Sequence, residues 1–370
     1  MGYGELDTPS VIVDLDVLER NIAEMAAVAM AEGVHLRPHI KTHKSPKIAR
    51  MQLDAGAVGI TCAKLGEAEA MADGGITDIF VCYPLVTAIK VRRLAALARR
   101  PGMTVSTIVD SPEGIAALSS VFAREPTPLE VLVKVDTGLG RVGVAPGDAT
   151  VALAQQVAAA PGLRFGGICM HEGQTYKYPD NAERAAAGRT AGERLVATAR
   201  ALDAVGLVPA RVSSGSTPGG PAAASVAGIT EMRPGNYAFY DAMQVGLNVV
   251  PPQRCALRVL VTVVSHTARD RAVMDAGSKT LTSDTGVHGM TGSAGHGLVV
   301  GKEDIQIVGL SEEHGWLKLD PQGSDVRIGE MLAVIPVHSC PVANLAGELV
   351  MVRGGGVVDR WPVAAAGKTT

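Results

Sequence analysis

Cysteine is scarce in this sequence and is not arranged for disulfides. The chain of 370 residues holds five cysteines, an odd number, and no two of them form a Cys-x-x-Cys pair. This spacing argues against a disulfide framework. Cys62, Cys82, Cys169 and Cys255 are expected to be small buried side chains, since free cysteine is commonly buried.

Long apolar runs and a basic surface are also missing. No run of about 18 apolar residues, the length that marks a membrane-spanning helix, occurs. The net charge is −3, and most Lys and Arg residues are scattered, so no face suits nucleic acid or an anionic membrane. The N-terminus lacks the basic and apolar segments of a signal peptide. We therefore expect a soluble, cytoplasmic protein whose partner is a small molecule.

Aromatic residues make up only 3% of the chain, whereas Ala, Val and Gly are abundant. Such a composition favours helices of small residues packed on a sheet rich in Val and Ile. A chain of 370 residues also exceeds the size at which a single core usually stops growing. One large domain and a second, smaller one are expected.

From about residue 33 to residue 245, short β-branched runs alternate with Ala- and Leu-rich helical stretches. The candidate strands are residues 35–37, 58–62, 78–82, 104–109, 131–135, 165–170, 211–213 and 229–232. This alternation predicts an α/β fold with a (β/α)₈ TIM-type barrel over residues 15–248. An open doubly wound sheet is the alternative, but no Gly-x-Gly-x-x-Gly opens a helix after the first strand.

The pattern changes after Pro251 and Pro252, where short strands follow one another without helices. The candidates are residues 259–264, 272–275, 298–300, 305–310, 317–319, 331–335, 349–353 and 357–360. Gly and Asp turns separate them, which predicts an all-β domain over residues 249–370. The apolar run near the N-terminus, within residues 1–14, is expected to join that domain as a further strand.

The densest cationic cluster lies at residues 35–44, where three His, two Lys and one Arg occur. The cluster follows a predicted strand, which is where barrels place functional residues. A lysine amine attacks an aldehyde only when it is neutral, and Arg37, His39, His43 and Lys44 are suitable neighbours to lower the pKa of Lys41. A solvated cationic loop is the alternative interpretation.

The motif Arg-Pro-His-Ile-Lys-Thr-His-Lys at residues 37–44 resembles the segment around the cofactor lysine in one family of enzymes. These are the pyridoxal-phosphate enzymes with an alanine-racemase-like barrel (fold type III), in the branch of D-threonine aldolases and D-serine dehydratases. The resemblance runs from residues 7–9 to residues 338–341. It implies that pyridoxal 5'-phosphate binds at Lys41 and that the chain forms a homodimer with the site at its interface.

Polar clusters after the later strands fit a phosphate-binding site. The Gly- and Ser-rich residues 213–220 precede a predicted helix, whose backbone N–H groups favour a phosphate. The resemblance further implies that Arg141 contacts the phenolic oxygen of the cofactor, that His171 lies beside its ring and that Arg233 faces its pyridine nitrogen. The expected cofactor-binding residues are Lys41, Arg141, His171, Ser214, Gly215, Ser216, Thr217, Arg233, Gly235, Asn236 and Tyr237.

His338 and Cys340 are predicted to lie on a strand of the second domain, where a period of two places both side chains on one side. An isolated His-x-Cys pair is weak evidence for a metal, but it resembles the metal pair of this family. Imidazole with thiolate suits Zn²⁺, whereas relatives with His-x-Asp suit Mn²⁺ or Mg²⁺. We therefore expect a divalent metal without assigning the ion.

The resemblance implies a low-specificity D-threonine aldolase that cleaves D-β-hydroxy-α-amino acids to glycine and an aldehyde. Lys41 and His171 are the expected catalytic residues, with His171 or a group at the metal as the base for the β-hydroxyl. A D-serine dehydratase that releases pyruvate and ammonia is the main alternative. A non-catalytic pyridoxal-phosphate-binding protein is the other, although such carriers lack the second domain.

Overall fold

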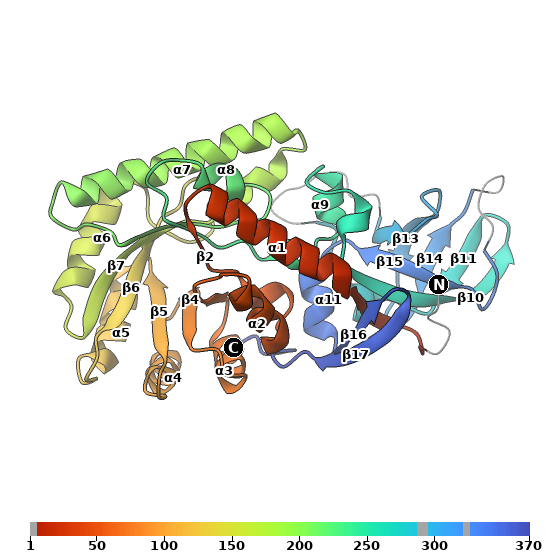
Figure 1. Cartoon of the computed structure of the whole chain (residues 1–370), viewed down its shortest axis with the longest axis horizontal. Coiled ribbons are helices and arrows are strands. Elements are labelled where there is room, and N and C mark those ends of the chain that lie inside the picture. The colour runs from red at the N-terminus through yellow and green to blue at the C-terminus, as the bar shows by residue number, and fades with distance from the viewer. Residues whose placement is uncertain (1–5, 287–294, 321–325) are drawn as a thin grey trace.

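The computed structural model describes residues 6–286, 295–320 and 326–370. Its elements form two β-structures that lie side by side, with the α/β part on the left of Figure 1 and the antiparallel part on the right. Within these ranges, no helix is both long and apolar enough to cross a membrane.

Eight parallel strands form the first structure, in the spatial order β2-β9-β8-β7-β6-β5-β4-β3. Their bounds are β2 (His35–Leu36), β3 (Ile60–Cys62), β4 (Asp78–Pro84), β5 (Thr104–Val109), β6 (Leu129–Lys134), β7 (Leu163–Cys169), β8 (Arg211–Ser214) and β9 (Glu231–Met232). The ring closes between the segments of β2 and β3, where Val58 N–H donates to Leu36 O at 2.9 Å and Thr61 N–H to Pro38 O at 2.8 Å. The predicted TIM-type barrel is confirmed.

Helices cover the outside of this barrel, and their caps follow from the sequence. Ser111 caps one of them by accepting from Gly114 N–H at 3.2 Å, and Pro112 occupies its first turn, where a missing N–H costs nothing. The helices are α1 (Leu15–Ala31), α2 (Pro46–Asp54), α3 (Leu65–Asp73), α4 (Ala88–Ala98), α5 (Pro112–Phe122), α6 (Asp148–Ala159), α7 (Asn181–Asp203) and α8 (Gly220–Ala224). A further helix, α9 (Ala242–Gly246), lies beside the second structure, where Met243 N–H donates to Val337 O at 3.2 Å (Figure 1). Short 3₁₀ turns add η1 (Ile40–Thr42), η2 (Gly173–Lys177), η3 (Asn236–Ala238) and η4 (Pro252–Arg254).

The second structure is a nine-stranded sheet in the order β11-β14-β13-β12-β15-β10-β1-β16-β17, and β11 also pairs with β10, which closes part of it into a barrel. Its strands are β1 (Ser10–Asp14), β10 (Leu257–Ala268), β11 (Arg271–Met274), β12 (Gly297–Val299), β13 (Gln306–Leu310), β14 (Gly315–Lys318), β15 (Met331–Pro336), β16 (Glu348–Arg353) and β17 (Gly356–Pro362).

The N-terminal strand joins this second sheet, as the sequence predicted, because β1 pairs antiparallel with β10 and parallel with β16. Two short helices interrupt the strands, α10 (Ser278–Leu281) and α11 (Ser339–Leu345). The predicted domain boundaries, at residues 14/15 and 248/249, stay a prediction, and residues 1–5 lie outside the described ranges.

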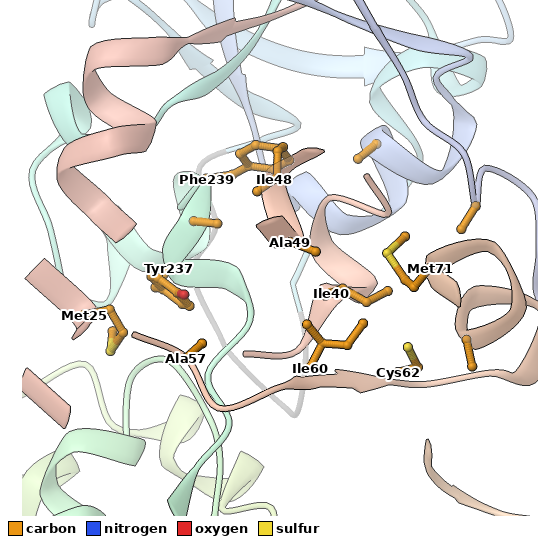
Figure 2. Close-up of a cluster of buried hydrophobic side chains, with 14 of the residues drawn as sticks. Met25, Ile40, Ile48, Ala49, Ala57, Ile60, Cys62, Met71, Tyr237 and Phe239 are labelled. Carbon is orange, nitrogen blue, oxygen red and sulfur yellow. The ribbon is translucent and has the colours of Figure 1, made fainter. Parts of the chain in front are cut away.

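Apolar side chains fix the turn that contains Lys41. Figure 2 shows Ile40 close to Ile60 of β3 and pointing towards Met71 of α3, and all three side chains are fully buried. Burying an Ile side chain stabilises a fold by roughly 1.5–3 kcal/mol. This contact therefore anchors η1 directly beside the lysine.

Candidate active site

A cavity of about 260 Å³ opens at the carboxyl ends of the barrel strands. Lys41 in η1, His171 after β7 and Arg233 after β9 line it, and α11 of the second sheet contributes its first turn. The predicted site residues that this cavity brings together are Lys41, Arg141, His171, Gly215, Ser216, Thr217, Arg233, Gly235, Asn236, His338 and Cys340.

Ser214 and Tyr237 do not line the cavity, and their predicted part in cofactor binding stays a prediction. The Ser214 hydroxyl is buried and donates to Glu231 O at 3.5 Å. The Tyr237 phenol accepts from Gln52 Nε2 at 2.9 Å, and its backbone N–H donates to Thr217 Oγ1 at 3.2 Å. Sequence position put both residues near the site, but their side chains point into the surrounding core.

Three of the expected cationic neighbours of Lys41 also face away from the cavity. Arg37 forms ion pairs with Glu231 at 2.8 Å and with Asp78 inside the barrel. His43 contacts Gln52 at 3.2 Å, and Lys44 pairs with Glu67 at 3.3 Å.

Among the four expected neighbours, His39 is the one that lines the cavity, where its Nδ1 accepts from Lys41 N–H at 3.3 Å. Burial, together with the nearby cations Lys41, Arg233 and Arg141, lowers the pKa of His39 and keeps its ring neutral.

Lys134 is a site residue that sequence reasoning missed. It ends β6, is only 3% exposed and lines the cavity together with Arg141 and Arg233. The available signal was a lysine at the carboxyl end of an otherwise apolar strand, which is where barrels place functional groups. Cys82, Thr42, Val142 and Tyr176 complete the lining.

Arg141 is carried by a loop that one carboxylate organises. Asp136 accepts from the backbone N–H groups of Gly138, Leu139 and Gly140, each at 2.9 Å. Gly143 has a φ of +119°, and a Cβ there would lie 2.7 Å from Asp136 N, so the chain needs glycine to close this loop. The loop thereby holds Arg141 at the cavity mouth.

His171 is oriented by its neighbours and is uncharged. Its Nδ1 hydrogen-bonds Gly215 O, and because a carbonyl only accepts, the proton lies on Nδ1. Burial and the charges of Lys41, Lys134 and Arg141 lower the pKa of His171 well below its usual value. The neutral ring therefore carries its lone pair on Nε2, which can accept a proton.

Hydroxyl groups and close backbone make a phosphate cradle on one side. Ser216 Oγ accepts from Gly219 N–H at 3.0 Å, and Thr217 Oγ1 accepts from Tyr237 N–H at 3.2 Å, so both hydroxyl protons can be donated to a ligand. A Cβ on Gly235 would approach His39 O at 2.8 Å, so only glycine lets the backbone come this close. Together with the Lys41 amine, these groups fit a phosphorylated aldehyde.

Arg233 is fixed before any ligand binds. Its guanidinium donates to Met170 O at 2.6 Å and to Ser213 Oγ, and the side chain is buried. It lies 5.6 Å from the ring centre of Phe80 inside the barrel. Arg233 is thus a rigid cation at the cavity floor.

His338 and Cys340 line the cavity, but the prediction that they lie on a strand is wrong. β15 ends at Pro336, His338 is the N-cap of α11, and Cys340 lies in the first turn of that helix. His338 Nδ1 hydrogen-bonds Asp284 Oδ2 at 2.7 Å, and Cys340 Sγ hydrogen-bonds Thr42 Oγ1 at 3.2 Å. Through the hydrogen bond to Thr42, Cys340 lies against η1, the turn that contains Lys41.

Electrostatics favour a charged pair at this position. Burial opposes the charge on His338, but the Cys340 sulfur and Asp284 raise the pKa of His338 to about 10. Burial likewise opposes the thiolate, but His338, Lys41 and Thr42 lower the pKa of Cys340. A bound metal ion would displace the proton from His338 Nε2, and a thiolate with an imidazole held by a carboxylate fits Zn²⁺. Across the described parts of the chain, no group of three or more His, Cys, Asp or Glu side chains is placed to hold a metal ion.

A buried carboxylate links the phosphate cradle to α11. Asp241 accepts from Asn236 Nδ2 at 2.6 Å and from Ser339 N–H at 3.0 Å. Ser339 lies between His338 and Cys340, so this contact fixes the start of α11 against the segment that follows β9. The two halves of the cavity are thereby held together.

Comparisons with known proteins agree with this architecture. Residues 13–242 match the family model for the alanine racemase N-terminal domain, and residues 256–352 match the model described as "Putative serine dehydratase domain". Over 377 residues the chain is 37% identical to the 3-hydroxy-D-aspartate aldolase of Paracoccus denitrificans (strain Pd 1222), covering 100% of this chain and 94% of that protein.

Two solved structures share the whole fold. The D-threonine aldolase from Filomicrobium marinum has a TM-score of 0.91 and 35% identity, covering 99% of this chain and 97% of the other. The D-threo-3-hydroxyaspartate dehydratase from Delftia sp. HT23 has a TM-score of 0.89 and 32% identity, covering 97% of both chains. One structure of a cysteine-to-alanine mutant of that dehydratase is of its metal-free form.

Proposed function

Since the chain belongs to the D-threonine aldolase and D-serine dehydratase branch of the alanine-racemase-like enzymes, we propose that it is a pyridoxal-phosphate- and metal-dependent lyase. Its reaction is the cleavage of D-β-hydroxy-α-amino acids, such as D-threonine, to glycine and an aldehyde. The observation that carries the proposal is a single cavity that unites Lys41, a phosphate cradle and the His338–Cys340 pair.

The cofactor would be held by the residues that fit it. The Lys41 amine binds its aldehyde, and Ser216, Thr217 and the backbone around Gly235 and Asn236 bind its phosphate. When bound, pyridoxal phosphate supplies an electron sink for the charge that develops at Cα during bond cleavage. Arg141 and Arg233 would contact the phenolic oxygen and the ring nitrogen. An arginine beside the ring nitrogen leaves that nitrogen unprotonated. The cofactor is then a weaker electron sink than one whose ring nitrogen is paired with a carboxylate.

His338 and Cys340 would hold the divalent ion, which is Zn²⁺ by their chemistry. A bound ion supplies Lewis acidity that lowers the pKa of a substrate hydroxyl. The neutral Nε2 of His171 takes the hydroxyl proton, the Cα–Cβ bond breaks, and its electron pair stays at Cα until a proton returns there to give glycine.

The main alternative reaction uses the same residues for β-elimination. In a dehydratase, Lys41 removes the Cα proton and hydroxide leaves from Cβ, so D-serine gives pyruvate and ammonia. The His-x-Cys pair and the likeness to the Delftia dehydratase favour this alternative. Incubating the purified protein with D-threonine and D-serine separates the two. We expect acetaldehyde and glycine from D-threonine, and faster pyruvate release from D-serine would reverse the assignment.

The substrate could carry a carboxylate on Cβ, as 3-hydroxyaspartate does, in place of the methyl group of threonine. Lys41, Lys134, Arg141 and Arg233 line the cavity, and the described lining includes no Asp or Glu. This excess of positive charge suits a second carboxylate, and the Paracoccus relative is a 3-hydroxy-D-aspartate aldolase. Comparing kcat/KM for D-threonine and D-3-hydroxyaspartate decides between a neutral and an acidic substituent.

We also propose that the enzyme is a cytoplasmic homodimer. Tyr83 near the end of β4, Val86 after it and Ile89 at the start of α4 expose 39%, 53% and 64% of their surface, which suits an interface between two copies. Its five free cysteines suit a reducing compartment. Light scattering on the purified protein should give twice the mass of the chain, and a monomer would contradict the dimer.

A further inference from the structure

We propose that Lys44 is a positioning residue that holds the Lys41 turn against α11, and so sets the distance between the cofactor lysine and the His338–Cys340 pair. The inference rests on the proposed function. Lys44 is only 5% exposed, and it does not line the cavity. Its role would therefore be indirect, through the segments that it joins.

The first contact ties Lys44 to the helix that carries the metal pair. Lys44 Nζ donates to Asn344 Oδ1, near the end of α11, at 2.6 Å. At the start of the same helix, Thr42 Oγ1 hydrogen-bonds Cys340 Sγ at 3.2 Å. The three-residue segment 42–44 thus holds α11 at both of its ends.

The second contact anchors Lys44 in the barrel. Lys44 Nζ lies 3.3 Å from Glu67 Oε1, and both side chains are buried. Glu67 is itself fixed, because its Oε2 accepts from Ala63 N–H at 2.6 Å and from Lys64 N–H at 3.2 Å as the capping box of α3. Lys44 therefore bridges a rigid barrel helix and α11.

The backbone of Lys44 points to the same role. Its φ is +50°, a left-handed conformation that glycine or asparagine adopts more readily than lysine. Its carbonyl accepts from Ala365 N–H at 3.2 Å, and Gly367 N–H donates to Asn344 Oδ1 at 3.2 Å, so the C-terminal segment also meets this point. A lysine in an unfavourable conformation indicates that its side chain is needed there.

The consequence for catalysis follows from geometry. Lys41 and Cys340 reach the cavity from two different sheets, and a misplacement of about 1 Å at a reacting group can cost about 100-fold in rate. Other contacts, including β1 in the second sheet and Asp241 at the start of α11, keep the two structures joined when Lys44 is lost. Loss of the Lys44 contacts should thus loosen α11 without unfolding the protein.

The test compares Lys44→Met with Lys47→Met in the holoenzyme. Lys47 also joins the two structures, since its Nζ lies 3.1 Å from Asp359 Oδ2 of β17, but it is half-exposed. For Lys44→Met we expect kcat for D-threonine cleavage to fall about 100-fold, with KM and pyridoxal-phosphate affinity unchanged. Amide hydrogen exchange should speed up in residues 339–345 alone. Lys47→Met should match the wild type in every measurement.

A second variant covers the case in which Lys44→Met does not fold, because it leaves Glu67 without its partner. Asn344→Ala breaks the contact to α11 and keeps the Lys44–Glu67 pair. It should cause the same fall in kcat, and the double variant should be no worse than either single one. A variant that loses thermal stability but keeps kcat and slow exchange in α11 would overturn the role of Lys44. A wild-type protein that cleaves no β-hydroxy amino acid would instead contradict the proposed function, while the exchange measurement would still test the contact.

Discussion

The position of Lys41 follows from the contacts of the residues on either side of it in sequence. Ile40 is buried in the core, His39 accepts from the Lys41 N–H, and Thr42 reaches Cys340. The other cations of the cavity, Lys134, Arg141 and Arg233, come from distant parts of the chain. At this scale, the site is a lysine amine among cations and neutral imidazoles.

Lys41 should be the residue that binds pyridoxal phosphate, because its side chain shares the cavity with the phosphate cradle. Borohydride reduction of the holoenzyme followed by peptide mapping should place the pyridoxyl group on Lys41, and Lys41→Ala should lose the label. A label on Lys44 or Lys134 would contradict this assignment.

His43 should make the protein less stable in mild acid. Its ring is buried against Gln52 and Phe239, and burial lowers its pKa from 6.5 to about 4. The unfolded chain binds the proton first, so the stability is complete above about pH 6.5 and is lost as the pH falls towards 4, by about 3 kcal/mol in total. His43→Asn should flatten this part of the pH dependence of the unfolding free energy, measured by denaturant titration. The exposed His35 serves as control, because His35→Asn should keep the slope.

At the scale of elements, two short segments place the reactive groups. The loop after β6 is held by Asp136 and presents Arg141, while α11 begins at the His338–Cys340 pair and is held by Asp241 and Lys44. Both segments follow strands, so a rigid sheet fixes where each begins. The hydrogen bonds of the Arg141 loop are local, whereas those of α11 come from residues far away in sequence, which explains why local pattern alone placed His338 and Cys340 on a strand.

Asp284 should control the affinity of the metal pair. It holds His338 Nδ1 at 2.7 Å, which directs Nε2 to the metal position. Losing such a partner typically weakens metal binding about 10- to 100-fold, so Asp284→Asn should raise the dissociation constant for Zn²⁺ by that factor. Competition with a chromogenic chelator measures it, and the exposed Asp203→Asn should leave affinity unchanged. Equal affinity in both variants would exclude the pair as the metal site.

At the scale of the whole molecule, the cavity exists because two sheets meet. The barrel supplies Lys41, His171 and the phosphate cradle, and the second sheet supplies α11 (Figure 1). Substrate would lie between them, with its amino group towards Lys41 and its hydroxyl towards Cys340. If substrate binds in this way, we expect the proposed reaction to be sensitive to the configuration at Cα.

L-threonine should not be cleaved, whereas D-threonine should be. Inversion at Cα, with the amino and carboxylate groups held, moves the carbon that bears the hydroxyl away from the His338–Cys340 side of the cavity. Aldehyde release from both isomers, followed with a coupled alcohol dehydrogenase, tests this expectation. Comparable rates would mean that the hydroxyl is not recognised by the second sheet.

The sequence by itself determined the eight barrel strands and the N-terminal strand that joins the second sheet, because β/α periodicity is a short-range signal. A dense local motif likewise singled out Lys41, whose side chain lines the cavity and whose role as the cofactor lysine stays a prediction. Only the tertiary structure decided which polar side chains meet. It turned Arg37, His43 and Lys44 away from the cavity and brought in Lys134. It also directed the side chains of Ser214 and Tyr237 into the core, and it placed the His338–Cys340 pair at the start of a helix against Thr42. The physical reason is that side-chain direction and long-range hydrogen bonds depend on how distant segments pack, and that packing leaves no local periodic signal in the sequence.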